Sequence, residues 1–270
     1  MMLGKLRVEP IYDGTLWLDG GAMFGIIPKT LWSKVTKPDE KNRIRLGMYS
    51  LLLFTEPKIL IDTGIGNKSL KKMQKIYRID GGHILDSLNS FNVTPQDIGI
   101  VINTHLHFDH AGGNTWKHND EIKPTFPNAQ YIIQREEWNA ANNLNELTHA
   151  SYLKDNIEPL QDQIKIIDGD EEVIPGVTAI CTGGHTKGHQ IIKIVSEDTV
   201  GVYLGDLIPT TLHLPLPYIM SYDLNPIVTL NRKKEVLAQA AQENWTLFFE
   251  HDTIIQSGTV VYQGKQYHLL

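Results

Sequence analysis

The chain has one cysteine among its 270 residues, beside 11 histidines. A single cysteine excludes an intrachain disulfide framework, a multi-cysteine zinc finger and an iron–sulfur cluster, so histidine and carboxylate would have to hold any metal. No run approaches the ~18 consecutive apolar residues of a membrane span. Residues 1–7 also reach charged side chains too early for a secretory signal. We therefore expect a cytoplasmic protein with no membrane partner.

The sequence also lacks a strong charge of either sign, because 31 acidic and 25 basic residues give a formal net charge of -6. This modest acidic balance offers no general attraction to nucleic acid, so we expect a small-molecule substrate instead. Glycine and proline are spread evenly, and there is no low-complexity tract or repeat of fixed period. The simplest organisation is one domain over residues 1–270.

Short β-rich runs bounded by turn residues predict strands. They cover residues 15–18, 50–54, 58–61, 98–102, 130–133, 177–181, 190–195, 199–204, 246–249 and 259–262. Helices are predicted over residues 69–77, 83–91, 134–143 and 226–244. Together these elements indicate an α/β fold of packed sheets covered by helices. Residues from about 140 to 163 are polar and Asn-rich and predict a lid-like insertion, whereas Arg232, Lys233 and Lys234 predict a solvated helix face.

A dense group of possible metal ligands directly follows the predicted strand 98–102. It reads Thr104-His105-Leu106-His107-Phe108-Asp109-His110. Residues two apart in an extended loop point the same way, so His105 and His107 can converge on one ion, and a turn can direct Asp109 and His110 toward a second. Such titratable groups are costly to pack together unless something pairs them. Imidazole and carboxylate suit zinc first, with iron, cobalt or manganese as alternatives.

Three more possible ligands each lie at the carboxyl end of a predicted strand. They are His185, Asp206 and His251. Taken singly, each would more often be a hydrogen-bonded structural residue. Together with the first group they complete a donor set for two metal ions.

The series His105-x-His107-x-Asp109-His110, followed by His185, Asp206 and His251, resembles the full ligand series of the metallo-β-lactamase superfamily. The resemblance implies a four-layer αβ/βα metallo-β-lactamase sandwich with two divalent ions at one edge. It places His105, His107 and His185 on the first ion, Asp109, His110 and His251 on the second, and Asp206 between them. It also implies that Asp62, in Leu60-Ile61-Asp62-Thr63-Gly64, supports the site from behind, and that His189 is structural.

Such a site is suited to hydrolysis. Two divalent ions can share a hydroxide, because coordination lowers the pKa of bound water from 15.7 to about 7. The ions also polarise a carbonyl or phosphoryl oxygen of the substrate. Asp109 is then the expected catalytic residue, holding or moving the proton.

The N-terminal segment from about 19 to 45 resembles the quorum-quenching N-acyl-homoserine lactonase branch and the related methyl parathion hydrolase branch. The resemblance is carried by residues 19–29, by Leu31-Trp32 and by Asn42-Arg43-Ile44. It implies that this segment lines the substrate entrance, that the reaction opens the lactone ring of N-acyl-L-homoserine lactones, and that the protein is a homodimer. Met23, Phe24, Ile26 and Trp32 would contact the acyl tail, unless they belong to the core or to a dimer interface.

One departure concerns a tyrosine that assists at the carbonyl in some of these lactonases, because its position is occupied by Pro209. His213, Tyr218 and Tyr222 are the alternative donors nearby in sequence. Phosphotriester, ester and thioester hydrolysis remain open as alternative activities of the same superfamily. A glyoxalase II enzyme is disfavoured because only 19 residues follow His251. Nuclease and flavodiiron relatives add domains that we do not expect here, and His107 replaces the glutamate typical of the flavodiiron branch.

Overall fold

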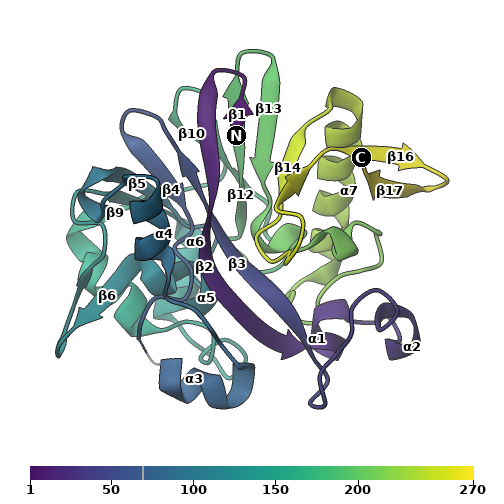
Figure 1. Cartoon of the computed structure of the whole chain (residues 1–270), viewed down its shortest axis with the longest axis horizontal. Coiled ribbons are helices and arrows are strands. Elements are labelled where there is room, and N and C mark those ends of the chain that lie inside the picture. The colour runs from purple at the N-terminus through teal and green to yellow at the C-terminus, as the bar shows by residue number, and fades with distance from the viewer. Residues whose placement is uncertain (69) are drawn as a thin grey trace.

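Two mixed β-sheets lie face to face in the computed structural model, which describes residues 1–68 and 70–270 (Figure 1). The first sheet has the order β1 (Met2–Leu3), β2 (Leu6–Asp19), β3 (Arg43–Leu53), β4 (Lys58–Ile61), β5 (Ile98–Ile102), β8 (Gln130–Gln134) and β9 (Ile164–Ile167). The second has the order β10 (Glu171–Ile174), β11 (Val177–Cys181), β12 (Gln190–Ser196), β13 (Thr199–Tyr203), β14 (Thr246–Phe248) and β15 (Ser257–Gly258). Two separate hairpins are formed by β6 (Thr115–His118) with β7 (Glu121–Pro124), and by β16 (Val260–Gln263) with β17 (Gln266–Leu269).

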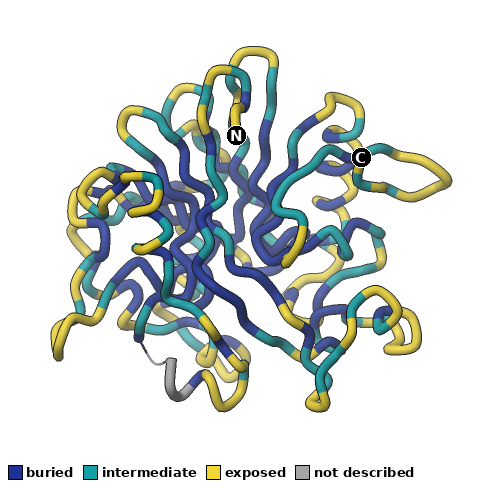
Figure 2. The backbone as a smooth tube through the Cα atoms, in the orientation of Figure 1, coloured by how far each residue is buried: buried dark blue, intermediate teal, exposed yellow. Residues whose placement is uncertain are grey.

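The central core fills the space between the two sheets, where the strands are buried along most of their length (Figure 2). Successive side chains of a strand point to opposite faces. In β3, Leu51 and Leu53 therefore face the second sheet, whereas Leu52 faces the helices outside. Both faces of this sheet are therefore apolar and buried, one against the second sheet and the other against the helices.

Helices lie on the two outer faces and at the edge of the sandwich where β2 ends (Figure 1). They are α1 (Gly20–Phe24), α2 (Lys29–Trp32), α3 (Leu70–Tyr77), α4 (Ile84–Ser90), α5 (Phe108–Ala111), α6 (Arg135–Asn142) and α7 (Pro226–Glu243). Apolar residues of α4 and α6 pack on the first sheet, and those of α7 pack on the second (Figure 1). The predicted four-layer αβ/βα sandwich is thus confirmed.

The predicted elements are present, with some differences in extent. The bounds of β4, β5 and β11 agree with the predicted runs, whereas β2 and β3 form a much longer ladder than expected. Some strands were not predicted from the sequence patterns. They include β9, β10, both strands of the hairpin β6–β7, and β17 of the hairpin β16–β17. The predicted helix 69–77 corresponds to α3, except for Ser69, which lies outside the described residues.

The prediction of a solvated face on α7 is wrong for its middle residue. Arg232 and Lys234 are exposed, but Lys233 is 0% exposed. Its Nζ donates hydrogen bonds of 2.9 Å to the carbonyl oxygens of Pro215 and Tyr218, and burial lowers its pKa to about 7. A buried lysine thus holds the loop that precedes α7.

Parallel strands end at the same edge of the sandwich. β4 pairs in parallel with β5, and β13 with β14. The polar loops that follow these strands consequently meet. Of the helices formed by residues 1–68 and 70–270, none has the length and apolarity to cross a membrane.

Candidate metal centre

All seven predicted ligand side chains lie at this edge, on loops that follow β5, β11, β13 and β14. They are His105, His107, Asp109, His110, His185, Asp206 and His251. Six of them are buried and His107 is half-buried. The structure thus brings together residues that lie up to 146 positions apart, from 105 to 251.

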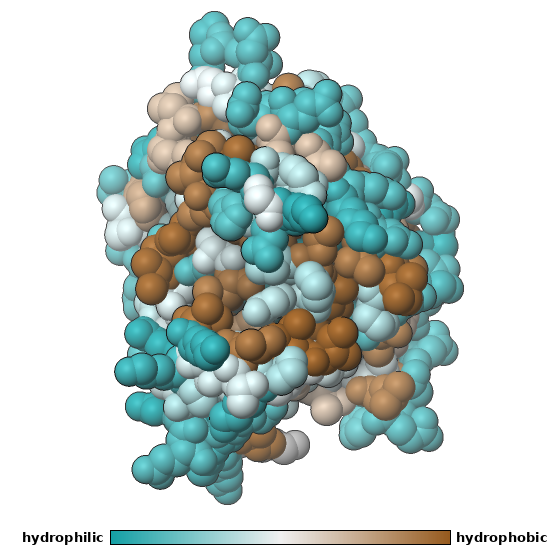
Figure 3. All heavy atoms as spheres, turned by 90° about the vertical axis from the view of Figure 1, so that its right-hand side faces the viewer, coloured by the Kyte–Doolittle hydropathy of each residue, from teal (hydrophilic) through white to brown (hydrophobic). Residues whose placement is uncertain are grey.

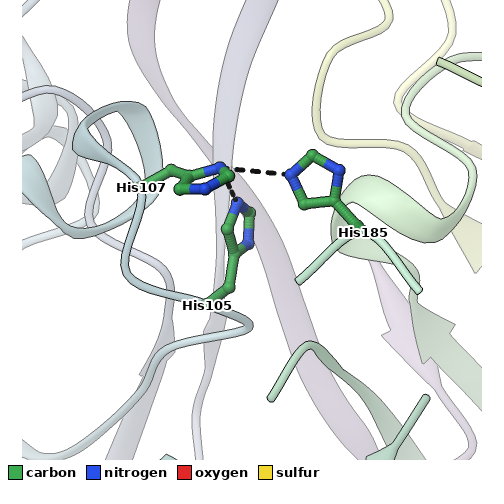
Figure 4. A group of neighbouring side chains, drawn as sticks. All are labelled: His105, His107 and His185. Carbon is green, nitrogen blue, oxygen red and sulfur yellow. Dashed lines mark hydrogen bonds between the residues drawn. The ribbon is translucent and has the colours of Figure 1, made fainter. Parts of the chain in front are cut away.

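The first group consists of His105, His107 and His185, whose rings converge (Figure 4). His107 Nδ1 lies 3.0 Å from His105 Nε2 and 3.1 Å from His185 Nε2. The backbone at His107 is extended, with φ -63° and ψ 156°, which is the conformation expected to place His105 and His107 on one side.

The second group consists of Asp109, His110 and His251, whose ligand atoms all lie within 4.8 Å of one another. His110 Nε2 is 3.3 Å from His251 Nε2 and 4.0 Å from Asp109 Oδ2. The single turn of α5 brings Asp109 and His110 together beside His251, with the centroid of the His110 ring also 3.9 Å from that of His105, so the two groups adjoin. This is the turn that the sequence predicted.

Asp206 lies between the two groups. Its Oδ2 is 3.1 Å from His185 Nε2, and its Oδ1 is 3.2 Å from His251 Nε2. Oδ1 is buried, and among the described residues it has no hydrogen bond of good geometry. Converging imidazole nitrogens and a buried carboxylate oxygen of this kind are the ligand atoms of zinc sites, so the donor set fits two divalent cations.

The second ring nitrogen of each buried ligand histidine has its own partner, which fixes the ring orientation. His185 Nδ1 lies 2.9 Å from Asp223 Oδ1, and His251 Nδ1 lies 2.8 Å from the carbonyl oxygen of Gly47. His110 Nδ1 is close to two carboxylates, at 3.2 Å from Asp62 Oδ2 and 3.0 Å from Glu250 Oε2. His105 Nδ1 lies 3.1 Å from Thr104 Oγ1.

Two residues that the sequence resemblance placed in supporting roles, Asp62 and His189, lie in contact with the clustered groups. The Asp62 carboxylate accepts hydrogen bonds from Thr104 N at 2.7 Å and from Thr104 Oγ1 at 2.6 Å, besides contacting His110. Burial lowers the pKa of His189 to about 3, so its ring is neutral. His189 Nε2 accepts a 3.1 Å hydrogen bond from the backbone N–H of Asp206 and so positions the loop of that residue.

The pKa shifts of the clustered histidines differ in direction. In the first group, burial acts to lower the pKa of His185, but Asp206 and Asp223 outweigh the effect of burial and raise it. Burial, together with the neighbouring imidazoles, holds the pKa of His105 and of His107 well below the ordinary value. Neutral imidazole is the form that binds metals. Burial also acts to lower the pKa of His251, but the carboxylates of Asp206 and Glu250 outweigh it and raise the pKa to about 9. A cation would take the place of that proton.

A cavity of about 360 Å³ opens onto the centre. His107, Asp109, His185, Asp206 and His251 form part of its wall. Leu18 and Met23 contribute from the N-terminal segment, Leu147, Thr148 and Ser151 from the predicted lid, and residues 220–224 from the loop before α7. The chamber thus combines apolar side chains with the titratable groups of the centre, as in many small-molecule sites.

The predicted substrate contacts separate into three sets, which line the cavity, lie in the core or are exposed. Met23 and Tyr222 line the cavity. Phe24 and Trp32 instead lie in the core at 0% and 1% exposure, with ring centroids 5.4 Å apart, because these large rings fill the space beneath α1 and α2. Ile26 is 87% exposed and borders a neighbouring apolar hollow.

His213 is likewise buried rather than open to the cavity. Burial lowers its pKa to about 4, and its Nε2–H donates a 2.9 Å hydrogen bond to the carbonyl oxygen of Met23. Its Nδ1 lies 2.8 Å from Thr210 Oγ1. His213 therefore ties the N-terminal segment to the loop after β13.

Sequence reasoning missed several supporting residues, namely Glu137, Tyr152, Asp223 and Glu250. Glu250 directly precedes His251, and that adjacency was the one available signal. Asp223 and Glu137 lie in segments whose patterns indicate only a loop and a helix. Their roles arise from contacts between segments distant in the chain.

Comparison with known proteins agrees with this geometry. Residues 46–251 match the model of the Metallo-beta-lactamase superfamily. An N-acyl homoserine lactonase of a Bacillus species is 32% identical over 234 residues, which cover 80% of this chain and 86% of the relative. The structure of a probable metal-dependent hydrolase from Staphylococcus aureus is 32% identical, with a TM-score of 0.92 and coverage of 100% of this chain and 99% of that one.

A further solved structure is that of an N-acyl homoserine lactone hydrolase with the product N-hexanoyl-L-homoserine bound at its catalytic metal center. It is 27% identical, with a TM-score of 0.71 and coverage of 94% of this chain and 95% of that one. The family match spans more than half of the chain, and the buried His/Asp clusters lie within it. This chain therefore belongs to the metallo-β-lactamase superfamily and is a metal-dependent hydrolase.

Proposed function

We propose that this hydrolase opens the lactone ring of N-acyl-L-homoserine lactones, an activity that quenches quorum sensing. The observation that carries the proposal is that Asp109, Asp206 and clustered histidines lie in the wall of a cavity that apolar side chains also line. Such a cavity suits a substrate with a polar ester head and an apolar tail. The relatives named as lactonases support the choice of ester.

For the metals, we propose that His105, His107 and His185 hold one divalent ion and that Asp109, His110 and His251 hold the other. Asp206 would bridge them, and zinc suits this set of nitrogen and oxygen ligands. When bound, the pair would supply an activated water at neutral pH and polarise the ester carbonyl.

The chain's own residues would guide the proton and orient the ester. Asp109 lines the cavity and would accept a proton from the attacking water. A new C–O bond forms at the lactone carbonyl carbon, the ring C–O bond breaks, and Asp109 returns the proton to the departing alkoxide oxygen. Tyr222, which also lines the cavity, is the proposed hydroxyl donor in place of the tyrosine missing at Pro209, and burial raises its pKa, so it stays a phenol.

The N-terminal segment 19–45 and the lid-like segment 140–163 are proposed to form the entrance. Met23 of the segment 19–45 lines the cavity, and so do Leu147, Thr148 and Ser151 of the segment 140–163. Leu147 is 80% exposed although it borders the cavity, which suits contact with an acyl tail that extends outward. Burial of each methylene of such a tail would contribute about 0.8 kcal/mol.

A substrate panel tests the proposed activity. The zinc-loaded protein is offered N-hexanoyl- and N-decanoyl-homoserine lactone, a phosphotriester, a thioester and a β-lactam, and kcat/KM is measured for each. We expect the lactones to have the highest kcat/KM. If both lactones remain intact while another ester is cleaved, the lactone proposal fails and the alternative activity replaces it.

We also propose a homodimer. Apolar surface gathers across the face that carries α1, α2 and α7 (Figure 3). Exposed apolar residues of these elements and their neighbours include Ile26, Leu31, Leu224 and Ile227. A patch of this kind is typical of a protein–protein contact. Light scattering coupled to size exclusion should give twice the chain mass, and the mass of one chain would contradict the dimer.

A further inference from the structure

Glu137 carries a buried carboxylate for which the proposed reaction has no use. It is 1% exposed and lies in the first turn of α6. Its Oε1 accepts hydrogen bonds from Leu106 N at 2.9 Å and from the Tyr152 hydroxyl at 2.8 Å, and its Oε2 accepts one from Thr186 Oγ1 at 2.6 Å. These donors are neutral, and burial raises the pKa of Glu137. Burying a carboxylate among neutral donors is costly, so the arrangement calls for a reason.

Two of the three donors belong to segments that carry histidines of the first group. Leu106 lies between His105 and His107, and Thr186 directly follows His185. One carboxylate thus joins the loop after β5 to the loop after β11. These two loops supply all three converging rings of Figure 4.

The third donor connects the carboxylate to the lid. Tyr152 is 3% exposed, and its ring packs edge-on against that of His107, with centroids 5.0 Å apart. The two residues also form an isolated antiparallel β-bridge. Tyr152 lies next to Ser151, which lines the cavity together with Leu147 and Thr148.

The start of α6 is also pressed against the loop after β11. A Cβ atom at Gly188 would lie only 2.3 Å from the backbone nitrogen of Glu137, so the loop approaches the helix as closely as glycine allows. Gly188 lies between His185 and the structural His189. The helix is therefore in direct contact with the segment that carries the third histidine.

From these contacts we propose that Glu137 is a positioning residue that couples the lid to the first metal-binding group. Its two oxygens hold Leu106 and Thr186, and thereby His105, His107 and His185, at the separation that a cation requires. Through the hydrogen bond from Tyr152, the same carboxylate links the position of the lid to the positions of these histidines. The proposal rests on the proposed ligand assignment for the first metal ion.

Zinc affinity tests the coupling without any substrate. Stripped protein is titrated with Zn²⁺ against a chromophoric chelator for the wild type, E137Q, Y152F and T115V. Glu137→Gln keeps the shape but removes the charge, and Tyr152→Phe removes only the lid hydrogen bond. Thr115→Val is the matched control, because Thr115 Oγ1 donates a 2.6 Å hydrogen bond to the carbonyl oxygen of Asp155 in the lid without contacting Glu137.

We expect E137Q to weaken one of two zinc equivalents by about tenfold, the lower end of what partners of metal ligands contribute. Y152F should weaken the same equivalent, whereas T115V should keep both affinities even if its Tm falls. Wild-type affinity for both equivalents in E137Q and Y152F would overturn the coupling, as would an equal loss in T115V. Should E137Q fail to fold, Y152F against T115V decides alone. A wild-type protein that binds no zinc would instead overturn the ligand assignment and, with it, the coupling.

Discussion

Replacing Lys233 with methionine tests how the loop beside the cavity is held. The folded protein lowers the pKa of Lys233 from 10.5 to about 7, because the ammonium is buried. The folded state therefore binds fewer protons than the unfolded state between these values, so stability should rise with pH across this range. The slope approaches about 1.4 kcal/mol per pH unit when the difference is one full proton.

From pH 7.5 to 9.5 the wild type should therefore gain roughly 2 kcal/mol in unfolding free energy relative to K233M. K233M also leaves the carbonyl oxygens of Pro215 and Tyr218 without their donor, at a pH-independent cost of roughly 1–3 kcal/mol each. The pH slope thus separates the charge from the lost hydrogen bonds. Since residues 220–224 line the cavity, K233M should also raise KM.

The assay is urea unfolding of zinc-loaded wild type, K233M and K234M at pH 7.5, 8.5 and 9.5. Lys234 is exposed on the same helix, so K234M should follow the wild-type slope. If the difference in unfolding free energy between wild type and K233M stayed constant across this pH range, Lys233 would keep its charge in the folded protein. That result would refute the reasoning.

Three further substitutions probe the centre and the cavity. Asp109→Asn should lower kcat/KM for the lactone by about 10²–10⁴-fold, as expected for loss of a proton-transfer group, and turnover close to wild type would show that Asp109 has another role. Asp223→Asn removes the carboxylate 2.9 Å from His185 Nδ1. The affinity for one zinc equivalent, measured by chelator competition, should therefore fall by about 10–100-fold. Unchanged affinity for both equivalents would count against the orienting role. Tyr222→Phe should lower kcat by up to about 10²-fold with little change in KM if the phenol stabilises the developing oxyanion, while a change in KM alone would indicate a packing role.

The candidate ligand series could be proposed from the sequence because its histidines and carboxylates follow short β-rich runs. His185, Asp206 and His251 each follow such a run, and parallel strands bring their carboxyl ends together. The pairing of His105 with His107 followed from the two-residue repeat of side-chain direction in extended backbone. The separate direction of Asp109 and His110 followed from a single turn. Local rules were sufficient there. The strands and helices indicated packed sheets covered by helices, and the resemblance to the superfamily implied the four-layer order.

The supporting contacts were not accessible in this way, since they depend on how distant loops pack. The oxygens of Glu137 and Asp223 reach residues 31 and 38 positions away, respectively, and neither segment shows a pattern of its own. Lys233 looks like part of a solvated face because its neighbours in sequence are charged. Its burial follows from the loop of residues 215–218, which covers the helix at that point. Phe24 and Trp32 are apolar enough for either a cavity or a core, and packing places them in the core.

The most direct single measurement follows lactone opening as zinc is returned to the stripped protein. Hydrolysis of N-hexanoyl-homoserine lactone is recorded by mass spectrometry, as the gain of one water, against the number of zinc ions bound per chain. We expect turnover to be absent without metal and to reach its plateau at about two equivalents, in keeping with a two-metal hydrolase. Full turnover in the stripped protein, or two bound equivalents with the lactone left intact, would contradict a dinuclear lactonase.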